Sequence, residues 1–249
     1  MSDFLRFLQG RPSNLQAERK WYNLAPNTAT GEAEVFLYDV IGESWFGGIT
    51  AKDFVRDLRA VAADKLVIRI NSPGGDITDG VAIRNALLEH PAKEKETHID
   101  GMAASTASWL PVGNVIMSPG AVMMIHEPYN IVMGDAESFR KQAEILDMFG
   151  DNIADMYAER AGGKREDWRD LMRAETWYTD QGAVDAGLAN EVAGKAVVEN
   201  RYDPNYLNVY RNVPKHLLER ATVQPEPRVD LLPGYLAYQR NRARLMGFG

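Results

Sequence analysis

The feature that most constrains this chain is a strand that runs directly into a glycine turn and then into a helix. Residues 66–70 (LVIRI) are apolar and β-branched around one arginine, and the turn NSPGGD follows at once. Apolar residues then recur at helical spacing from about Thr78 to Leu88. A strand, a turn and a helix in this order form the repeating unit of α/β folds, so we expect alternating strands and helices.

The rest of the chain continues this alternation. In chain order we expect a strand at VFLYDVIG, a helix after Thr50, a strand at THIDGMAAS leading into a buried helix from Ser105, strands at VIMS and AVMMIH, a long amphipathic helix over about 135–161, a short helix over 168–172, a strand at ETWYT and a helix from Thr179 to Gly187. Glycine or proline separates most of these segments. The pattern therefore predicts an α/β domain over 34–198.

Two flanking segments differ in composition from this domain. Residues 1–33 are mixed and polar and end in a loop-forming stretch, so we expect an N-terminal arm or leader. Residues 199–249 contain scattered prolines, and we expect a C-terminal extension that lies outside the core of the domain. Its end carries Arg240, Arg242 and Arg244 beside aromatic residues, and either a solvated terminus or a docking peptide fits that composition.

Composition excludes several classes of function. The chain has no cysteine, which rules out disulfides, thiolate metal ligands and a cysteine nucleophile. Its net charge of −7 argues against a general nucleic-acid surface, and no apolar run approaches the length of a membrane span. We expect a cytoplasmic protein that binds neither nucleic acid nor membrane.

The glycine turn is the first candidate for chemistry. Gly74 and Gly75 leave backbone amides without side chains in front of them, and such amides stabilise an oxyanion. A simple tight turn between strand and helix explains the same residues. Phosphate binding is disfavoured because the chain contains no GxxxxGK[ST] loop, which also means that it carries no recognisable ATPase motif.

Ser105 is the candidate nucleophile. It follows the small residues of GMAAS at the expected start of a helix, where the positive end of the helix dipole favours a developing alkoxide. Capping of the helix is the alternative role for a serine at this position.

His126 is the candidate general base because it ends the apolar strand AVMMIH, where α/β sheets place functional side chains. A structural histidine is the alternative. The other histidines, at 90, 98 and 216, are expected to be exposed. Without an HExxH motif or a cluster of histidines and carboxylates, the sequence implies no metal.

A serine and histidine pair needs a third group to orient the imidazole. Glu175, Asp180 and Asp185 are the downstream candidates. We favour Glu175, which precedes an aromatic pair, because acidic residues near the start of a helix, such as Asp180, are expected for helix capping alone.

Taken together, NSPGGD, GMAAS, MMIHEP, ETWYT and GAVDAGLAN resemble the ClpP family of Clp protease proteolytic subunits, from about residue 34 to 192. The resemblance implies a catalytic triad of Ser105, His126 and Glu175, with an oxyanion hole formed by Gly74 or Gly75 and by Thr106. The third position departs from the pattern, because the family most often has aspartate there. Asp180 therefore remains an alternative to Glu175. Ala107 replaces a usual glycine.

The resemblance also implies an architecture and partners. The expected fold is the ClpP and crotonase-like spiral of β-α units, with the long helix protruding as a handle through which subunits form a homo-oligomeric ring. The expected activity is that of a serine endopeptidase that needs no cofactor and cleaves proteins or peptides within a chamber. A separate AAA+ unfoldase is the expected partner of housekeeping members. Phage-type members instead process capsid or scaffold proteins during head maturation, and the proline-containing extension and polar leader favour this type.

Two other readings remain open from the sequence. A crotonase-type acyl-CoA hydratase or hydrolase uses the same fold and the same glycine turn. A catalytically idle assembly component needs none of the candidate site residues.

Overall fold

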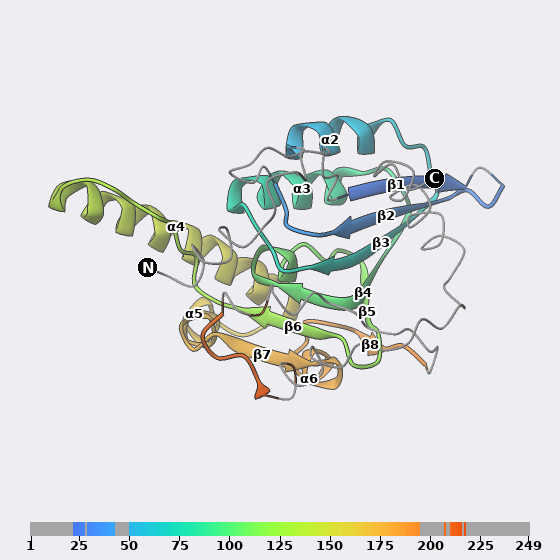
Figure 1. The fold of residues 1–249 in the computed structure, drawn as a ribbon. Helices are drawn as coiled ribbons and strands as arrows, with labels where there is room; N and C mark the ends of the chain where they lie inside the picture. Colours follow the sequence, from blue (N-terminus) through green and yellow to red (C-terminus); the bar gives the residue numbers. More distant parts are fainter. Residues whose placement is uncertain are drawn as a thin grey trace, which may run out of the picture.

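The computed structural model describes residues 22–27, 29–42, 50–194, 207, 210–215 and 217. In these ranges the chain forms one mixed sheet with helices packed around it (Figure 1). The strands are β1 (Tyr22–Asn27), β2 (Glu32–Tyr38), β3 (Lys65–Ser72), β4 (Glu94–Ala104), β5 (Asn114–Met117), β6 (Val122–Ile125), β7 (Thr176–Thr179) and β8 (Glu191–Val192). The helices are α2 (Ala51–Arg59), α3 (Ile77–Glu89), the 3-10 turn η1 (Ser105–Ser108), α4 (Ala136–Ala161), α5 (Arg165–Arg173) and α6 (Asp180–Asp185). The expected α/β fold is confirmed.

The sheet branches at its longest strand, β4. Strands run in the order β1-β2-β3-β4-β5-β8, and all of these neighbours except β1 and β2 are parallel. The first half of β4 pairs with β5, whereas its last residues pair in parallel with β6, which in turn pairs with antiparallel β7. The ends of β4 and β6 therefore lie side by side, which is the arrangement that positions the candidate site.

Alternation along the strands decides which face of the sheet is buried. In β3 the side chains of Leu66, Ile68 and Ile70 are fully buried, and the residues between them are partly exposed. Helices α2 and α3 cover this apolar face (Figure 1). On the other face the Arg69 guanidinium pairs with the nearly buried carboxylate of Asp100 on β4. The period of two in the sequence thus sets an apolar face and a polar face.

The ordered sheet begins earlier than the sequence indicated. Strand β1 lies within the segment assigned to an N-terminal arm, and it pairs with β2 along all six of its residues. Tyr22 is buried, packs edge-on against Phe54 and donates a hydrogen bond to Asp57. Hydrogen bonding to an edge strand and one buried aromatic ring hold this polar stretch in the sheet, and neither is visible in local composition.

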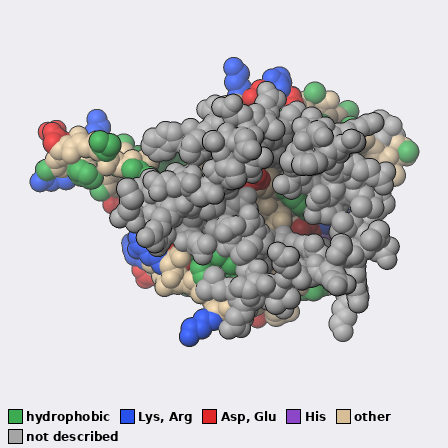
Figure 2. Space-filling view, viewed as in Figure 1, with side chains coloured by type: hydrophobic (Ala, Val, Ile, Leu, Met, Phe, Trp, Pro, Cys, Tyr) green, Lys and Arg blue, Asp and Glu red, His purple; other side chains and the backbone are tan. Residues whose placement is uncertain are grey.

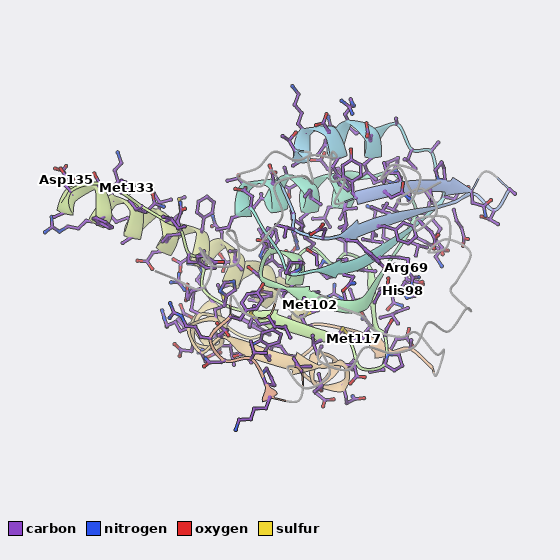
Figure 3. All side chains as sticks on the ribbon, viewed as in Figure 1. Arg69, His98, Met102, Met117, Met133 and Asp135 are labelled. Carbon is purple, nitrogen blue, oxygen red and sulfur yellow. The ribbon has the colours of Figure 1, made fainter. Side chains whose placement is uncertain are left out.

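Helix α4 projects from the body of the molecule (Figure 1). Asp135 caps it by accepting a hydrogen bond from the backbone amide of Ser138, and Gly162 ends it. Met133 and Asp135 lie at the far tip of this projection (Figure 3). Buried residues of α4 gather near its other end, where Ile153, Ala154 and Tyr157 join the core. The predicted long helix and its boundaries are confirmed.

Part of the C-terminal extension packs onto the domain, contrary to the expectation that it lies outside the core. Leu207 and Leu217 are fully buried. They form a second apolar cluster with four residues of β4 and β6, namely Met102, Ala104, Val122 and Met124. Residues 199–206, 208–209, 216 and 218–249 of the extension, which include the arginines near its end, fall outside the described residues. Because prolines are scattered through this segment, its composition did not indicate that its apolar residues anchor it to the domain.

In the part of the chain that the structure describes, no helix has the length and apolar character needed to cross a membrane.

Candidate active site

The turn after β3 lies against the end of β4. Its backbone is fixed on one side by Ile41, whose amide donates to the Gly74 carbonyl at 2.8 Å and whose carbonyl accepts from the amide of Asp76 at 3.0 Å. Gly74 has a φ of 96°, and a Cβ there would lie 2.7 Å from the Cβ of Ser105. The positive φ and the close approach both require glycine at this position.

The two glycine amides of this turn differ in what they bind. The Gly74 amide donates to the hydroxyl of Ser72 at 3.1 Å, so it is already satisfied. Within the described residues, the amides of Gly75 and Thr106 have no hydrogen-bond partner. The Thr106 side chain donates to the Gly75 carbonyl at 3.0 Å and so ties the turn to η1. Of the glycines named by the sequence, Gly75 has the amide that is open to a ligand.

Ser105 stands at the point where β4 ends and η1 begins. It has a φ of 54°, a strained conformation for a residue other than glycine. Ala104 occupies the N-cap position, so Ser105 does not take the capping role considered above. Because η1 is a single 3-10 turn of four residues, a large helix dipole is absent here. The unpaired amides at the start of this turn, rather than a helix macrodipole, provide the local positive potential.

His126 follows the last residue of β6, and parallel pairing brings it to Ser105. Ala104 is the register partner of Met124, so the residues after the two strands meet at the same edge of the sheet. His126 Nε2 lies 2.7 Å from the Ser105 hydroxyl, within hydrogen-bonding distance. The structure therefore brings these two predicted residues together.

The imidazole of His126 is enclosed by aromatic rings. Tyr129 and Tyr210 lie with ring centroids 5.5 Å and 5.8 Å from it. Burial lowers the pKa of His126 from 6.5 to about 4, while the nearby charge of Glu175 opposes this shift and that of Arg211 adds to it. The imidazole is consequently neutral at pH 7, which is the form that accepts a proton.

Glu175 lies beside His126 because β7 pairs with β6 in antiparallel register. Thr176 is opposite Ile125, which places the preceding residue near the imidazole. Its carboxylate accepts hydrogen bonds from the backbone amides of Arg211 at 3.0 Å and Asn212 at 2.6 Å. Glu175 therefore influences His126 through its charge, while amides of the C-terminal extension hold its oxygens.

Asp180 and Asp185, the alternatives for the third position, have other partners. Asp180 accepts the amides of Gly120 at 2.7 Å and Gln181 at 2.8 Å, and the Asp185 carboxylate accepts from the side chain of Gln181. Asp180 thus joins the start of α6 to the turn before β6. Only Glu175 among the three is part of the electrostatic environment of His126.

Comparison with known proteins identifies the family. The family model described as Clp protease matches residues 17–196, well over half of the chain. The chain belongs to the Clp protease family. Curated relatives agree with this assignment, and 280 of them match significantly.

Three of these relatives are proteolytic subunits of ATP-dependent Clp proteases. Subunit 1 of the ATP-dependent Clp protease of Leifsonia xyli is 28% identical over 154 residues, which cover 60% of this chain and 74% of the relative. Subunit 2 from Corynebacterium glutamicum is 31% identical over 148 residues, covering 58% and 69%. Subunit 2 from Corynebacterium diphtheriae is 30% identical over 152 residues, covering 59% and 72%.

Sequence reasoning missed the residues of the C-terminal extension that reach the site of this Clp protease family member. Tyr210 packs on His126, and the next two residues supply the amides that bind Glu175. No short motif marks them, because two of the three contacts use backbone atoms. The available signal was the three-to-four-residue spacing of the apolar residues at 207, 210, 213 and 217, which indicates a segment packed along one face.

His90 and His98 are less exposed than the sequence predicted. His90 was expected to be exposed but is buried, with its ring hydrogen-bonded to the Val61 carbonyl and the Ala92 amide. His98 is partly buried and lies 2.5 Å from Glu96, whereas His216 falls outside the described residues. A charged neighbourhood in the sequence did not predict exposure, because His90 caps the end of α3 and His98 lies within β4. Within the described chain, no cluster of histidine and acidic residues forms a metal site.

Proposed function

We propose that this Clp protease family member is a serine endopeptidase in which Ser105 is the nucleophile and His126 the general base. The observation that supports this most directly is the 2.7 Å separation of the Ser105 hydroxyl and His126 Nε2, beside the open amides of Gly75 and Thr106. A nucleophile, a base within hydrogen-bonding reach and two donors for an oxyanion are the minimum set for acyl transfer.

The proposed reaction follows from these positions. The Ser105 oxygen attacks the carbonyl carbon of the scissile peptide while His126 Nε2 takes its proton. The amides of Gly75 and Thr106 donate hydrogen bonds to the oxyanion that forms. The imidazolium then protonates the leaving amine, the C–N bond breaks, and water releases the acyl group from Ser105 by the reverse sequence. A neutral imidazole at pH 7 fits the first step.

In this proposal Glu175 stabilises the imidazolium by its charge. Among the described residues, its electrostatic attraction is the influence that raises the pKa of His126 against the effect of burial. The amides of Arg211 and Asn212 hold the carboxylate oxygens in place beside the imidazole.

Labelling with a fluorophosphonate probe tests the proposal, because such probes react with an activated serine. We expect the native chain to be labelled and Ser105→Ala to lose all labelling together with hydrolysis of a fluorogenic peptide. Ser138→Ala is the matched control, because the Ser138 hydroxyl donates to the Asp135 carboxylate at 2.8 Å at the start of α4 and does not contact the site. We expect that variant to be labelled.

Other outcomes would favour the alternative functions. Turnover of an acyl-CoA thioester without labelling of Ser105 would indicate a crotonase-type enzyme, and the absence of both reactions would indicate an assembly component. The hydrogen-bonded serine and histidine favour the peptidase, since the crotonase reading assigns no role to that pair.

We also propose that the chain works as a homo-oligomeric ring whose subunits meet through α4. The projection exposes apolar side chains, namely Met133 just before α4 and Phe139 and Met148 on it. Figure 2 shows hydrophobic side chains in green on the projection. The mass of the native particle in solution tests this, and replacing Phe139 and Met148 by serine should shift it toward the monomer. The relatives are named as subunits of an ATP-dependent protease, so an AAA+ unfoldase is a further proposed partner.

For the substrate we propose that the chain processes phage capsid or scaffold proteins in the cytoplasm. It rests on the sequence alone, namely on the polar leader and the proline-containing extension. Coexpression with phage head proteins tests it: Ser105-dependent cleavage of one of them supports it, and intact head proteins beside an active peptidase contradict it.

A further inference from the structure

We propose that Tyr210, with the two amides that follow it, is a positioning element of the active site contributed by the C-terminal extension. Tyr210 is the residue that touches three separate parts of the site at once. This inference deepens the proposed function and rests on it. The extension is thereby assigned a role in holding the site rather than in covering it.

The contacts of Tyr210 reach each side of the candidate triad. Its hydroxyl donates a hydrogen bond to the carbonyl of Pro73, in the glycine turn. Its ring lies edge-on to His126, with centroids 5.8 Å apart and planes at 80°. A second edge-on contact joins it to Trp177, two residues after Glu175, at 5.5 Å and 79°. One rigid side chain thus connects the oxyanion turn, the base and the strand that directly follows the acid.

The amides after Tyr210 fix the orientation of Glu175. Each carboxylate oxygen accepts one of them, from Arg211 at 3.0 Å and from Asn212 at 2.6 Å. The Asn212 side chain also donates to the carbonyl of Ala174 at 2.9 Å, which fixes the backbone beside Glu175. Glu175 itself has a φ of 50°, a conformation that persists only where surrounding contacts enforce it. The extension supplies part of these contacts, and the Glu175 amide adds a hydrogen bond to the Met172 carbonyl at 3.0 Å.

The segment is anchored on both sides of Tyr210. Leu207 and Leu217 are fully buried against Met102 and Ala104 of β4 and Val122 and Met124 of β6. In Figure 3, Met102 lies near the middle of the sheet, close to β6. These are the two strands whose ends carry Ser105 and His126. The anchoring residues and the site therefore share one rigid support.

The charged and titratable groups that face His126 come from three segments of the described chain. Glu175 faces it from the turn before β7, Tyr129 from the segment after β6, and Tyr210 and Arg211 from the extension. The Tyr210 ring removes water from one side of the imidazole, in keeping with the lowered pKa of His126. Without that ring, hydration of the imidazolium should raise the pKa of His126 toward its ordinary value.

The test compares Tyr210→Ala, Tyr210→Phe and the native full-length chain by the pH profile of fluorophosphonate labelling. We expect Tyr210→Ala to lower the labelling rate at least about tenfold at neutral pH and to move the acid midpoint upward by about one pH unit or more. Tyr210→Phe keeps the ring and should keep the native midpoint, with a rate reduced roughly fivefold by loss of the hydrogen bond to Pro73.

A matched control is available on β7. The Tyr178 hydroxyl is buried and has no hydrogen-bond partner among the described residues, so Tyr178→Phe removes a hydroxyl of the same kind that supports nothing in the site. We expect its labelling rate to equal that of the native chain. A purely structural role for Tyr210 would lower the amount of folded protein, yet it would not move the midpoint.

Two results would overturn the proposal. A native rate and midpoint in Tyr210→Ala would show that the ring positions nothing, and faster labelling in that variant would show that the segment obstructs the site. If the native chain is not labelled at all, the peptidase proposal fails, and NMR titration of the His126 ring, assigned with His126→Gln, replaces labelling. An upward shift of the midpoint in Tyr210→Ala then supports the contact, whereas an unchanged midpoint overturns it.

Discussion

The two sides of this active site are held by different means. On one side, Ser105 and His126 follow parallel strands, and their separation is set by the backbone register of β4 and β6. On the other side, Glu175 lies in a turn, and its carboxylate is held by amides about 36 residues further along the chain. The nucleophile and base therefore belong to the family framework, whereas the position of the acid depends on a segment outside the residues matched to the family.

Contacts of the residue after His126 also hold the first side of the site in place. Glu127, directly after His126, accepts a hydrogen bond from the buried guanidinium of Arg169 at 2.9 Å, and its amide donates to the Met172 carbonyl at 3.2 Å. Arg169 reaches Asp147 and Asp151 on α4 as well. The base is thus tied to two helices, and the comparison predicts that damage to this side is severe whereas damage to the acid side is graded.

The largest effect is expected from Gly75→Ala, on the side of the site that the strands hold. A Cβ at this position would lie 2.0 Å from the carbonyl oxygen of Ile41, which is backbone and has no room to move aside. We expect the variant to lose fluorophosphonate labelling and to show no cooperative unfolding at the native midpoint temperature. Its free energy of unfolding should fall by more than about 3 kcal/mol. Thermal unfolding and labelling of the purified variant check this.

Gly194→Ala is the control for that substitution. No atom lies within 4 Å of the position that its Cβ would occupy, so we expect a change in unfolding free energy below about 0.5 kcal/mol. Normal labelling of Gly75→Ala would mean that the side held by the strands tolerates a substitution as well as the acid side does. That result would contradict the comparison.

A smaller effect is expected on the acid side, where Glu175→Gln removes the charge but keeps the shape. We expect labelling to slow by at least about tenfold, because the imidazolium loses its negative neighbour. Asp180→Asn tests the alternative acid. Since Asp180 binds the Gly120 amide and not the imidazole, we expect its labelling rate to stay within about twofold and its stability to fall by about 1 kcal/mol. The opposite ranking of these two rates would assign the third position to Asp180.

The same contrast explains what the sequence could predict. Elements with strong periodicity were found from the sequence, such as β3 with its alternating buried residues and α4 with its aspartate cap and glycine end. The proximity of Ser105 and His126 followed from motifs at the ends of adjacent strands. The roles of these residues stay a proposal.

The rest depended on contacts that local sequence does not encode. Strand β1 is polar and is held by pairing with β2, so its composition resembled that of an arm. The choice between Gly74 and Gly75 depended on the Ser72 hydroxyl, which takes one of the two amides. The contacts of the extension with Glu175 use backbone donors across a long separation in sequence, and no residue type marks a backbone donor.

The smallest effect is expected from pH, and it concerns the residue that both sides share. An ordinary imidazole would be about 97% protonated at pH 5, whereas one with a pKa of about 4 would be about 90% neutral. We therefore expect labelling to fall less than about twofold between pH 7 and pH 5. A roughly 25-fold fall over that range would mean that the imidazole is solvated as in a free peptide.

Stability gives an independent check with a definite sign. Because folding lowers the pKa of His126, its neutral form stabilises the native state fully above pH 6.5, and this contribution is lost as the pH falls from 6.5 toward 4. The difference in unfolding free energy between the native chain and His126→Gln cancels the other titrating groups. Below pH 6.5 the unfolding free energy of the native chain should fall relative to that of His126→Gln, because the glutamine does not titrate. A difference that is independent of pH would mean that the imidazole is as well hydrated in the folded chain as in the unfolded one, and that neither the strands nor the extension shields it.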